Sequence, residues 1–441
     1  MSMDSKIDHL SGLNETETFD FPIITMGDFD KLVTHLMQRD IRAIESYEAK
    51  VKAGETPTES KRIPPPILVL GKAGIGKTEI IRGVAQKLGI GFREMRLVNY
   101  TEIDLVGIPF KNENNMTEHA ANDLFPLEER DGKFGILLID EFTSATRQVQ
   151  VPILQLTDVS RSVGHYKLPD GWKVIIAGNG PDDGGTFNNL PGTVISRASC
   201  FYAISQQNAW LSWAYEKGIH PVIRAYIKYR PSDLHAYKSD EDYDRAFPCP
   251  RSWCNLSTVL TDYDQSLREG GVYDPDMLSC LVAAYVGRPT AERFIAFEAF
   301  RKDILKPEEI LKNTDAAKKC HLHDMKKEEV RWLTVTSLAT KVRELMDSYF
   351  SKRLKEGKGR PTIDEIMRDK YGVLLINAFN WVSASSADKT SNSLVAAELI
   401  QFAMKELISA NGFLVEFTNS KEFATQCPNA RQYLDSSRMR S

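Results

Sequence analysis

The fold is set by an eight-residue stretch, Gly71-Lys72-Ala73-Gly74-Ile75-Gly76-Lys77-Thr78. It follows the apolar run Ile67–Leu70, and a segment with helical spacing begins after it at Glu79. Glycines let successive backbone N–H groups face one anion, and a helix N-terminus favours negative charge. A buried strand, a glycine-rich loop and a helix start therefore predict that Gly71 through Glu79 bind the phosphates of a nucleoside triphosphate.

Two side chains of this loop have separate predicted roles. Lys77 is predicted to reach the β- and γ-phosphates, and the Thr78 hydroxyl is predicted to bind Mg²⁺. The alternative is a glycine turn with an incidental lysine. The apolar run before the loop and the helical spacing after it favour the phosphate site.

A second strand supplies the acidic residues that such a site needs. The run Gly135-Ile136-Leu137-Leu138-Ile139 ends in Asp140 and Glu141. Asp140 is predicted to lie near the Mg²⁺, and Glu141 is predicted to be the general base that polarises the attacking water. The alternative is a pair of acids that only cap a strand, which their place after a phosphate loop disfavours.

A third strand carries a polar amide at its end. The run Lys173–Ala177 is followed by Gly178-Asn179-Gly180. The Asn179 side chain can hydrogen-bond the attacking water or a γ-phosphate oxygen, although asparagine before glycine is also a turn signal. We predict the first role because this strand comes in the right order along the chain.

Two arginines complete the predicted site. Arg197 stands just before the apolar run Cys200–Ile204, where it could reach the γ-phosphate bound by a neighbouring subunit. Arg251 follows a proline pair at a helix start, where a guanidinium can bind phosphate oxygens. The alternatives are an ordinary surface arginine for Arg197 and a structural role for Arg251, which the helix dipole disfavours.

Short apolar runs alternate with helical patterns from residue 61 to 205, which predicts an α/β domain with a parallel five-stranded sheet. Residues 1–60 predict an N-terminal helical extension and linker, in which 1–26 are polar. Residues 206–302 predict a helical lid domain, and 303–441 a helix-rich region with a polar tail from Thr418. Alternation around Pro169-Asp170-Gly171 predicts a β-hairpin at 161–173. The predicted strands are Ile67–Leu70, Phe92–Val98, Phe134–Ile139, Lys173–Ala177 and Cys200–Ile204.

Bulk properties indicate a cytoplasmic protein without a membrane segment. The 441 residues carry a net charge of −4, and the six cysteines have no disulfide-framework spacing. The N-terminus lacks the basic and apolar regions of a signal peptide, and the longest apolar runs are too short to span a bilayer. The near-balanced charge argues against a surface that coats nucleic acid.

Taken in order, these residues resemble the AAA+ ATPases and, among them, the MoxR-like members with an insert in helix 2. The loop at residues 71–78, the pair Asp140-Glu141, and then Asn179, Arg197 and Arg251 correspond to Walker A, Walker B, sensor 1, the arginine finger and sensor 2. Asp104–Pro109, the hairpin at 161–173 and Tyr285-Val286-Gly287 add local similarity. The resemblance covers residues 62–300.

This resemblance implies a five-stranded P-loop NTPase domain of αβα type and a ring, expected to be a hexamer, with ATP and Mg²⁺ between subunits. Hydrolysis would move the lid and the hairpin to remodel or activate a protein partner, as a chaperone-like motor. MoxR-type ATPases often act with von Willebrand factor A domain proteins, which suggests that class of partner. Arg251 could act on the nucleotide of its own subunit or of its neighbour.

Two other functions stay open from the sequence. A nucleotide-gated scaffold would bind ATP in order to assemble and would hydrolyse it only to reset. A nucleic-acid motor would use the cations of the predicted hairpin, although the acidic pI of about 6.1 and the absence of a nucleic-acid-binding module argue against it. Those cations are Arg161, His165, Lys167 and Lys173.

Overall fold

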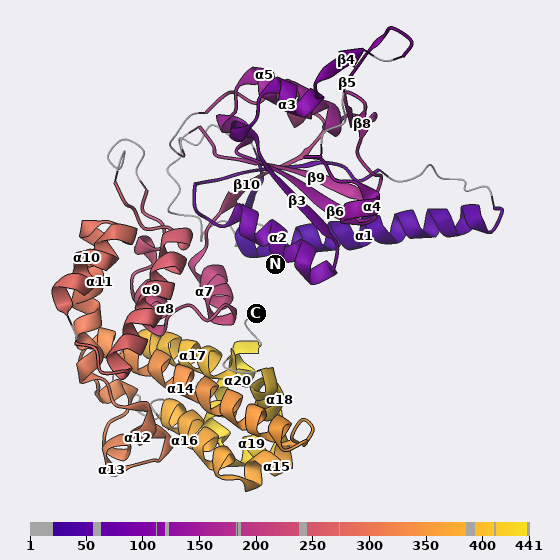
Figure 1. Cartoon of the computed structure of the whole chain (residues 1–441). Coiled ribbons are helices and arrows are strands. Elements are labelled where there is room, and N and C mark those ends of the chain that lie inside the picture. Colours follow the sequence, from indigo (N-terminus) through magenta and orange to yellow (C-terminus); the bar gives the residue numbers. More distant parts are fainter. Residues whose placement is uncertain are drawn as a thin grey trace. The chain divides into compact units, whose positions relative to one another are not determined.

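The computed structural model describes residues 21–55, 63–111, 113–119, 123–181, 183, 187–237, 245–272, 274–384, 393–409 and 412–438. The chain divides into two compact units, which are coloured from indigo to magenta and from magenta to yellow in Figure 1. The first unit comprises Met1–Ala209 and Tyr237–Asp244, and the second comprises Trp210–Ala236 and Arg245–Ser441. None of the described helices is long and apolar enough to cross a membrane.

The first unit is built on a six-stranded sheet in the order β1-β10-β2-β9-β6-β3, in which every pair is parallel. Its strands are β1 (Ile23–Thr25), β2 (Ile67–Leu70), β3 (Gly91–Arg96), β6 (Gly135–Asp140), β9 (Trp172–Gly178) and β10 (Ser199–Ile204). The predicted α/β class with a parallel sheet is confirmed. Five of the strands lie within two residues of the predicted starts or ends.

The predicted strand count of five is wrong because β1 adds a sixth strand at the edge of the sheet. Ile23 to Thr25 pair with Tyr202 to Ile204 of β10. Three residues are too few to show the alternation by which a strand is recognised from sequence. The chain then turns directly into a helix, which the Thr25 hydroxyl caps by accepting a hydrogen bond from the Asp28 N–H at 3.1 Å.

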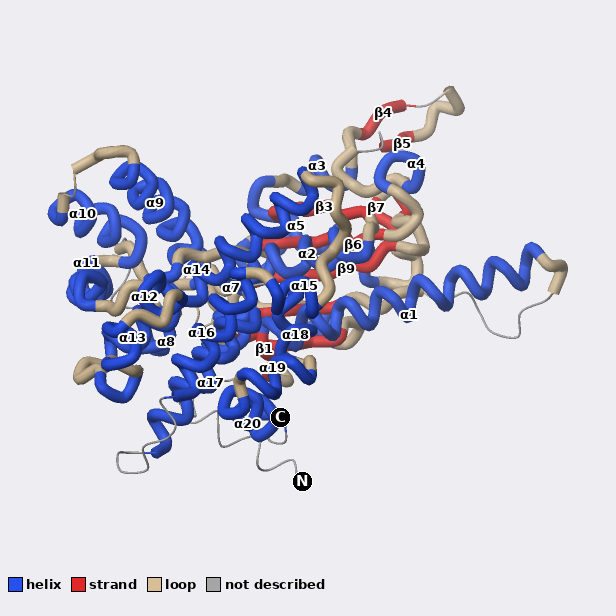
Figure 2. Tube along the Cα trace, turned by 90° about the horizontal axis from the view of Figure 1, so that it is seen from below, coloured by secondary structure: helices blue, strands red, loops and turns tan. Residues whose placement is uncertain are grey.

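Helices cover both faces of this sheet (Figure 1). On one face α1 (Met26–Lys52) and α2 (Lys77–Leu88) bury apolar side chains against the strands. On the other face α3 (Glu102–Val106) and α5 (Arg147–Leu154) form a second apolar cluster. The far half of α1 extends past the sheet in both views (Figure 1 and Figure 2). The other α-helices in the described part of this unit are α4 (Glu128–Asp131) and α6 (Gly192–Ile195).

Two antiparallel hairpins accompany the sheet: β4 (Pro109–Lys111) with β5 (Thr117–His119), and β7 (Ser162–Val163) with β8 (Tyr166–Lys167). The second hairpin lies within the predicted range, but its turn is at Gly164-His165, not at Pro169-Asp170-Gly171. Gly164 adopts the left-handed φ of 55° that such a turn requires. Gly171 serves close packing instead, because a Cβ there would lie 2.3 Å from the Lys133 carbonyl oxygen.

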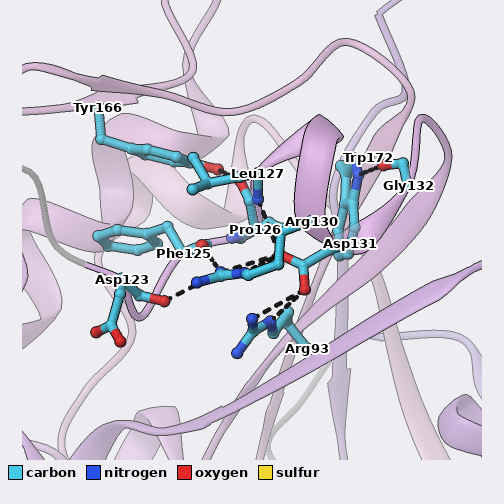
Figure 3. Close-up of polar contacts among 10 residues, drawn as sticks. All are labelled: Arg93, Asp123, Phe125, Pro126, Leu127, Arg130, Asp131, Gly132, Tyr166 and Trp172. Carbon is cyan, nitrogen blue, oxygen red and sulfur yellow. Dashed lines mark hydrogen bonds and ion pairs between the residues drawn. The ribbon is translucent and has the colours of Figure 1, made fainter.

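A tryptophan fills the space above two glycines where the strands begin. Gly91 of β3, Gly135 of β6 and Trp172 of β9 are register neighbours on adjacent strands. A Cβ on Gly135 would lie 2.5 Å from the indole ring, and one on Gly91 would lie 2.7 Å from it. The Trp172 Nε1–H donates to the Gly132 carbonyl at 2.9 Å (Figure 3). The fully buried ring therefore occupies space that the side chain of any other residue at either glycine position would enter.

Beside this tryptophan, Asp131 accepts three hydrogen bonds that join β3 to the segment 127–131 (Figure 3). Its carboxylate accepts hydrogen bonds from Arg93 Nε, Arg130 Nε and the Leu127 N–H, each at 2.9 Å. Burial acts to raise the pKa of Asp131, but these hydrogen bonds outweigh it and lower the pKa. The Arg93 bond brings the start of β3 into the network, so the segment before β6 is fixed by charge as well as by packing.

The second unit is helical in its described part. Its helices are α7 (Gln207–Glu216, beginning in the first unit), α8 (Pro221–Tyr229), α9 (Pro250–Arg268), α10 (Pro275–Val286), α11 (Arg288–Glu298), α12 (Pro307–Leu311), α13 (Asp315–Lys319), α14 (Glu328–Lys355), α15 (Ile363–Arg368), α16 (Lys370–Ala384), α17 (Ser393–Ser409), α18 (Gly412–Thr418), α19 (Lys421–Gln426) and α20 (Pro428–Arg438). One apolar cluster runs from Trp210 to Leu434 through the unit. The boundary predicted between 302 and 303 lies inside it.

The polar tail predicted from Thr418 is wrong, because α19 and α20 form there. Phe423 and Cys427 are fully buried, and Leu434 also joins the core. These apolar side chains are few and are spaced by helical turns, so the high average polarity of the segment conceals them.

Candidate functional site

Three glycines give the loop between β2 and α2 its shape. Gly71, Gly74 and Gly76 have φ angles of 155°, 76° and 100°, which side chains rarely adopt. A Cβ on Gly71 would also lie 2.4 Å from the Ala203 carbonyl oxygen of β10. The loop therefore passes close to the neighbouring strand and enters α2 at Gly76, as a phosphate-binding loop requires.

The Lys77 ammonium connects this loop with the end of β9. Its Nζ donates to the Gly71 carbonyl at 2.5 Å and to the Lys72 carbonyl at 3.1 Å. It also donates to Asn179 Oδ1 at 3.4 Å. The side chain is buried. Two of the predicted site residues, separated by 102 positions in the chain, are thus in contact.

Thr78 and Asp140 form the second contact of the site. The Thr78 hydroxyl donates to Asp140 Oδ2 at 2.5 Å, which joins the start of α2 to the end of β6. Asp140 Oδ1 accepts from the Glu141 N–H at 2.9 Å. A hydroxyl and a carboxylate at this separation are oxygen ligands of the kind that Mg²⁺ prefers, so the donor set fits that ion.

Glu141 lies just past β6 in an unusual backbone conformation. Its φ of 58° and ψ of 30° place it in the left-handed region, and its side chain is exposed. Such a conformation costs energy in a non-glycine residue and often marks a functional position. The carboxylate next to Asp140 is thus solvent-accessible, as a base acting on water needs to be.

Residues 67–183 match the family model described as "ATPase family associated with various cellular activities (AAA)". This range holds the loop, Asp140, Glu141 and Asn179. The chain contains an AAA ATPase domain. The expectation of an enzyme that hydrolyses ATP is therefore confirmed for this domain.

Over 69 residues the chain is 35% identical to the "ATP-dependent protease ATPase subunit HslU" of Campylobacter jejuni subsp. jejuni and to that of Campylobacter jejuni subsp. doylei. The similar stretch covers 16% of this chain and 16% of each relative. Both relatives agree with the AAA assignment. The similarity does not identify a branch within the AAA proteins.

The sequence did not indicate Arg96, which lies beside the acidic pair of the AAA domain. It ends β3 and is the register partner of Asp140. Its pKa is raised by a hydrogen bond to Glu94 and by that carboxylate's charge, with smaller contributions from the charges of Glu141 and Asp140. An arginine at the end of a strand carries no signal of its own, so only the pairing of β3 with β6 reveals it.

Thr143 and Asp183 were also missed, and both bind the backbone around Asn179. The Thr143 hydroxyl is hydrogen-bonded to the N–H and to the carbonyl of Asn179, each at 3.0 Å. Asp183 accepts from the Gly180 N–H at 2.5 Å and from the Tyr202 hydroxyl at 2.6 Å. For Asp183, the sequence signal is an acidic residue close after Asn179; no comparable signal marks Thr143.

The two predicted arginines are carried by other elements of the chain. Arg197 follows α6 with an exposed side chain, and its Nη2 is 3.4 Å from Asp158 Oδ2. Arg251 is exposed in the first turn of α9, in the second compact unit. Their roles stay predictions.

Two of the four hairpin cations proposed for nucleic-acid binding are buried. Arg161 is 3% exposed and donates to the carbonyls of Asp170 and Trp172. Lys173 is completely buried within β9, 2.8 Å from Asp40 Oδ2 of α1, and it donates to the Pro65 carbonyl at 3.1 Å. Both support the fold of the AAA domain and are not available to a nucleic-acid backbone.

Proposed function

We propose that this protein is a Mg²⁺-dependent ATPase that assembles as a ring and uses ATP hydrolysis to remodel or activate a protein partner. One observation carries the nucleotide site: three distant segments meet through the contacts Thr78–Asp140 and Lys77–Asn179. The AAA match supplies the reaction. Each half of the site lies at the carboxyl end of a parallel strand, where α/β proteins bind their ligands.

Each residue of this site has a separate proposed role. The backbone N–H groups of the loop and Lys77 would bind the phosphates, and Thr78 and Asp140 would hold Mg²⁺, which neutralises charge that develops on the phosphate oxygens. Glu141 would accept the proton of the attacking water. Asn179 would orient that water or the γ-phosphate from the end of β9, which lies between β2 and β6 in the sheet.

A ring is proposed because Arg197 is available for a neighbour. Its pairing with Asp158 joins two side chains that are 37% and 46% exposed, and such surface pairs contribute only about 0–1 kcal/mol. The guanidinium can therefore leave Asp158 at little cost and reach the γ-phosphate of an adjacent subunit. We propose a hexamer of the MoxR-like type in which Arg251 of the helical unit also contacts nucleotide.

A protein partner is proposed on two grounds. The HslU relatives are named as ATPase subunits of a protease, so they act together with another protein. The resemblance to MoxR-type ATPases favours a client or a von Willebrand factor A domain protein. Retention of one protein by the Glu141→Gln variant with ATP, and its release without ATP, would identify the partner.

The test of the nucleotide site is ATP turnover by Lys77→Ala and Glu141→Gln. Both variants are expected to lose at least about 100-fold in turnover, because each lacks a group that acts on the transferring phosphate or the water. Lys31→Ala, at an exposed position on α1, is the control and should match the parent protein. Turnover within twofold of the parent in both variants would disprove the site.

The ring is tested separately by light scattering of the Glu141→Gln variant with and without ATP and Mg²⁺. We expect the mass to rise to that of about six chains with nucleotide. Mass of a single chain under both conditions would remove the ring and the role of Arg197 while leaving the nucleotide site intact.

A further inference from the structure

One buried hydroxyl joins the two strand ends on which the proposed hydrolysis depends. Thr143 lies two residues after Glu141 and is fully buried. Its Oγ1 accepts a hydrogen bond from the Asn179 N–H and donates to the Asn179 carbonyl, each at 3.0 Å. A threonine hydroxyl has one proton to donate and lone pairs to accept, so both bonds form at once. Asn179 is thereby held at both its N–H and its carbonyl, which belong to two successive peptide units.

Neighbouring residues keep Thr143 in place. Its carbonyl accepts from the Asn188 N–H at 2.7 Å. The Gln150 side chain of α5 donates to the carbonyls of Phe142 and Ala145, at 2.9 and 3.2 Å. The short 3₁₀ helix Phe142–Ser144 after Glu141 is therefore fixed to α5.

The β9 side of the contact is equally constrained. A Cβ on Gly178 would lie 2.6 Å from Thr143 Oγ1, so only glycine allows the two strand ends to approach this closely. On the far side of Asn179, Asp183 is 2% exposed and holds the Gly180 N–H. The Asn179 side chain is left to extend toward Lys77, whose ammonium its Oδ1 meets.

We propose that Thr143 is a positioning residue that couples the Glu141 turn to Asn179. This hydroxyl fixes the position of Glu141 relative to Asn179. A movement of Asn179 on loss of the γ-phosphate is therefore transmitted to the backbone turn that carries Glu141. The inference rests on the roles proposed for Glu141 and Asn179. Thr143 does not touch the nucleotide; it acts through the Asn179 backbone.

Removing the hydroxyl should change turnover more than binding. Thr143→Val keeps the shape of the side chain but leaves the Asn179 N–H and carbonyl without this partner, so the backbone at Asn179 shifts. A misplacement of about 1 Å in a positioned group can cost roughly 100-fold in rate. Nucleotide binding depends mainly on the loop and α2, which Thr143 does not contact through any hydrogen bond described above.

The experiment compares ATP turnover and the affinity for a fluorescent ATP analogue in Thr143→Val and Thr143→Ser. We expect a 10- to 100-fold lower kcat with affinity within threefold for the valine variant, and recovery of most of the rate with serine, which keeps the hydroxyl. Thr157→Val is the matched control, because its hydroxyl donates only to Leu154 of the same domain and is remote in sequence from both catalytic strand ends. Its kcat should equal that of the parent.

A double-mutant cycle separates positioning from general destabilisation. If Thr143 acts through Asn179, adding Thr143→Val to Asn179→Ala should lower kcat by less than threefold further. A parent-like kcat in Thr143→Val, full additivity in the cycle, or an equal loss in Thr157→Val would each overturn the proposal. If the valine variant does not fold, Thr143→Ala takes its place in the same cycle.

These outcomes are independent of the nucleotide site itself. Lys77→Ala and Glu141→Gln report whether the proposed ATPase site exists. A parent-like Thr143→Val together with inactive Lys77→Ala and Glu141→Gln would remove only the coupling.

Discussion

Asp140 at the end of β6 is half-buried and Glu141 after it is exposed, whereas Glu406 of the helical unit lies inside the core beside Arg224. The first two carboxylates face the place where chemistry is proposed and make few bonds to the fold. The third is 2.9 Å from a buried guanidinium and has almost no access to solvent. Buried carboxylates of the first unit such as Asp40, which pairs with a buried lysine, also support the fold. The burial of a carboxylate, and not the unit that carries it, thus separates the exposed Glu141 from Glu406.

The buried pair of the helical unit joins four helices. Arg224 of α8 donates to Glu406 of α17 and, at 3.4 Å, to Thr340 of α14. Its guanidinium also lies over the Tyr215 ring of α7, 4.4 Å from the centroid. Burial raises the pKa of Glu406 and the Arg224 charge opposes it, so the pair depends on both partners being present.

The comparison is tested most strongly by one substitution made in both units. Glu141→Gln should lower turnover by about 10²- to 10⁴-fold because the base is lost, yet leave the free energy of unfolding nearly unchanged. Glu406→Gln should lower the free energy of unfolding of the helical unit by about 3–5 kcal/mol, because it strands the Arg224 charge. ATP turnover and urea denaturation measure the two effects. Equal stability loss in both variants would contradict the contrast.

A second substitution measures the contribution of close packing to the stability of the AAA domain. Gly135→Ala should lower the free energy of unfolding of this domain by about 1–3 kcal/mol, because the new methyl group meets the Trp172 ring at 2.5 Å. Calorimetry would measure the change. The double variant Gly135→Ala, Trp172→Leu should lose less free energy of unfolding than the sum of the two single variants. Full additivity would show that the Trp172 ring does not obstruct the new methyl group.

The stability of the helical unit should also depend on pH through Asp264. Asp264 accepts hydrogen bonds from Arg301 at 3.0 and 2.7 Å and lies 3.2 Å from His220 Nε2, with Glu298 lining the same small cavity. Burial acts to raise the pKa of Asp264, but His220 and Arg301 outweigh it and lower the pKa well below the usual value of 3.8. Its stabilising effect is therefore fully present above about pH 4 and is lost as the pH falls.

Asp264→Asn should accordingly cost about 2 kcal/mol at neutral pH and progressively less in acid. Thermal unfolding of both proteins between pH 7 and pH 3 measures the difference. A difference that stays constant over this range would show that charge at Asp264 does not contribute.

The smallest effect is expected at the surface of the helical unit. Arg360 and Glu416 are 2.9 Å apart, with side chains 60% and 57% exposed. Arg360→Ala should change the free energy of unfolding by less than about 1 kcal/mol. A loss of unfolding free energy as large as that in Glu406→Gln would mean that the effect of removing a charge does not depend on how deeply the charge is buried.

The sequence predicted the nucleotide half of the molecule because its signals are local. Each of β2, β6 and β9 is a short apolar run followed at once by the polar residues of the site. Parallel strands bring their carboxyl ends to one edge, and the contacts of Lys77 with Asn179 and of Thr78 with Asp140 agree with that expectation.

The remainder depends on contacts between residues far apart in the chain. Arg224 and Glu406 are separated by 182 positions, and Thr143 reaches Asn179 over 36, with no pattern to connect either pair. β1 was too short to show a period, and the helical turns near the C-terminus were concealed by polar composition. The roles of Arg197 and Arg251 involve a neighbour or the other unit, so they stay predictions.

Lys173 has a practical consequence for the cloning of the AAA domain. The family match begins at residue 67, yet the ammonium inside β9 lies against Asp40, which belongs to α1. A gene fragment cut to the matched range would delete that carboxylate and uncover the apolar face beneath the helix. Such a fragment is expected to accumulate as inclusion bodies, so expression of the domain alone should start no later than residue 21.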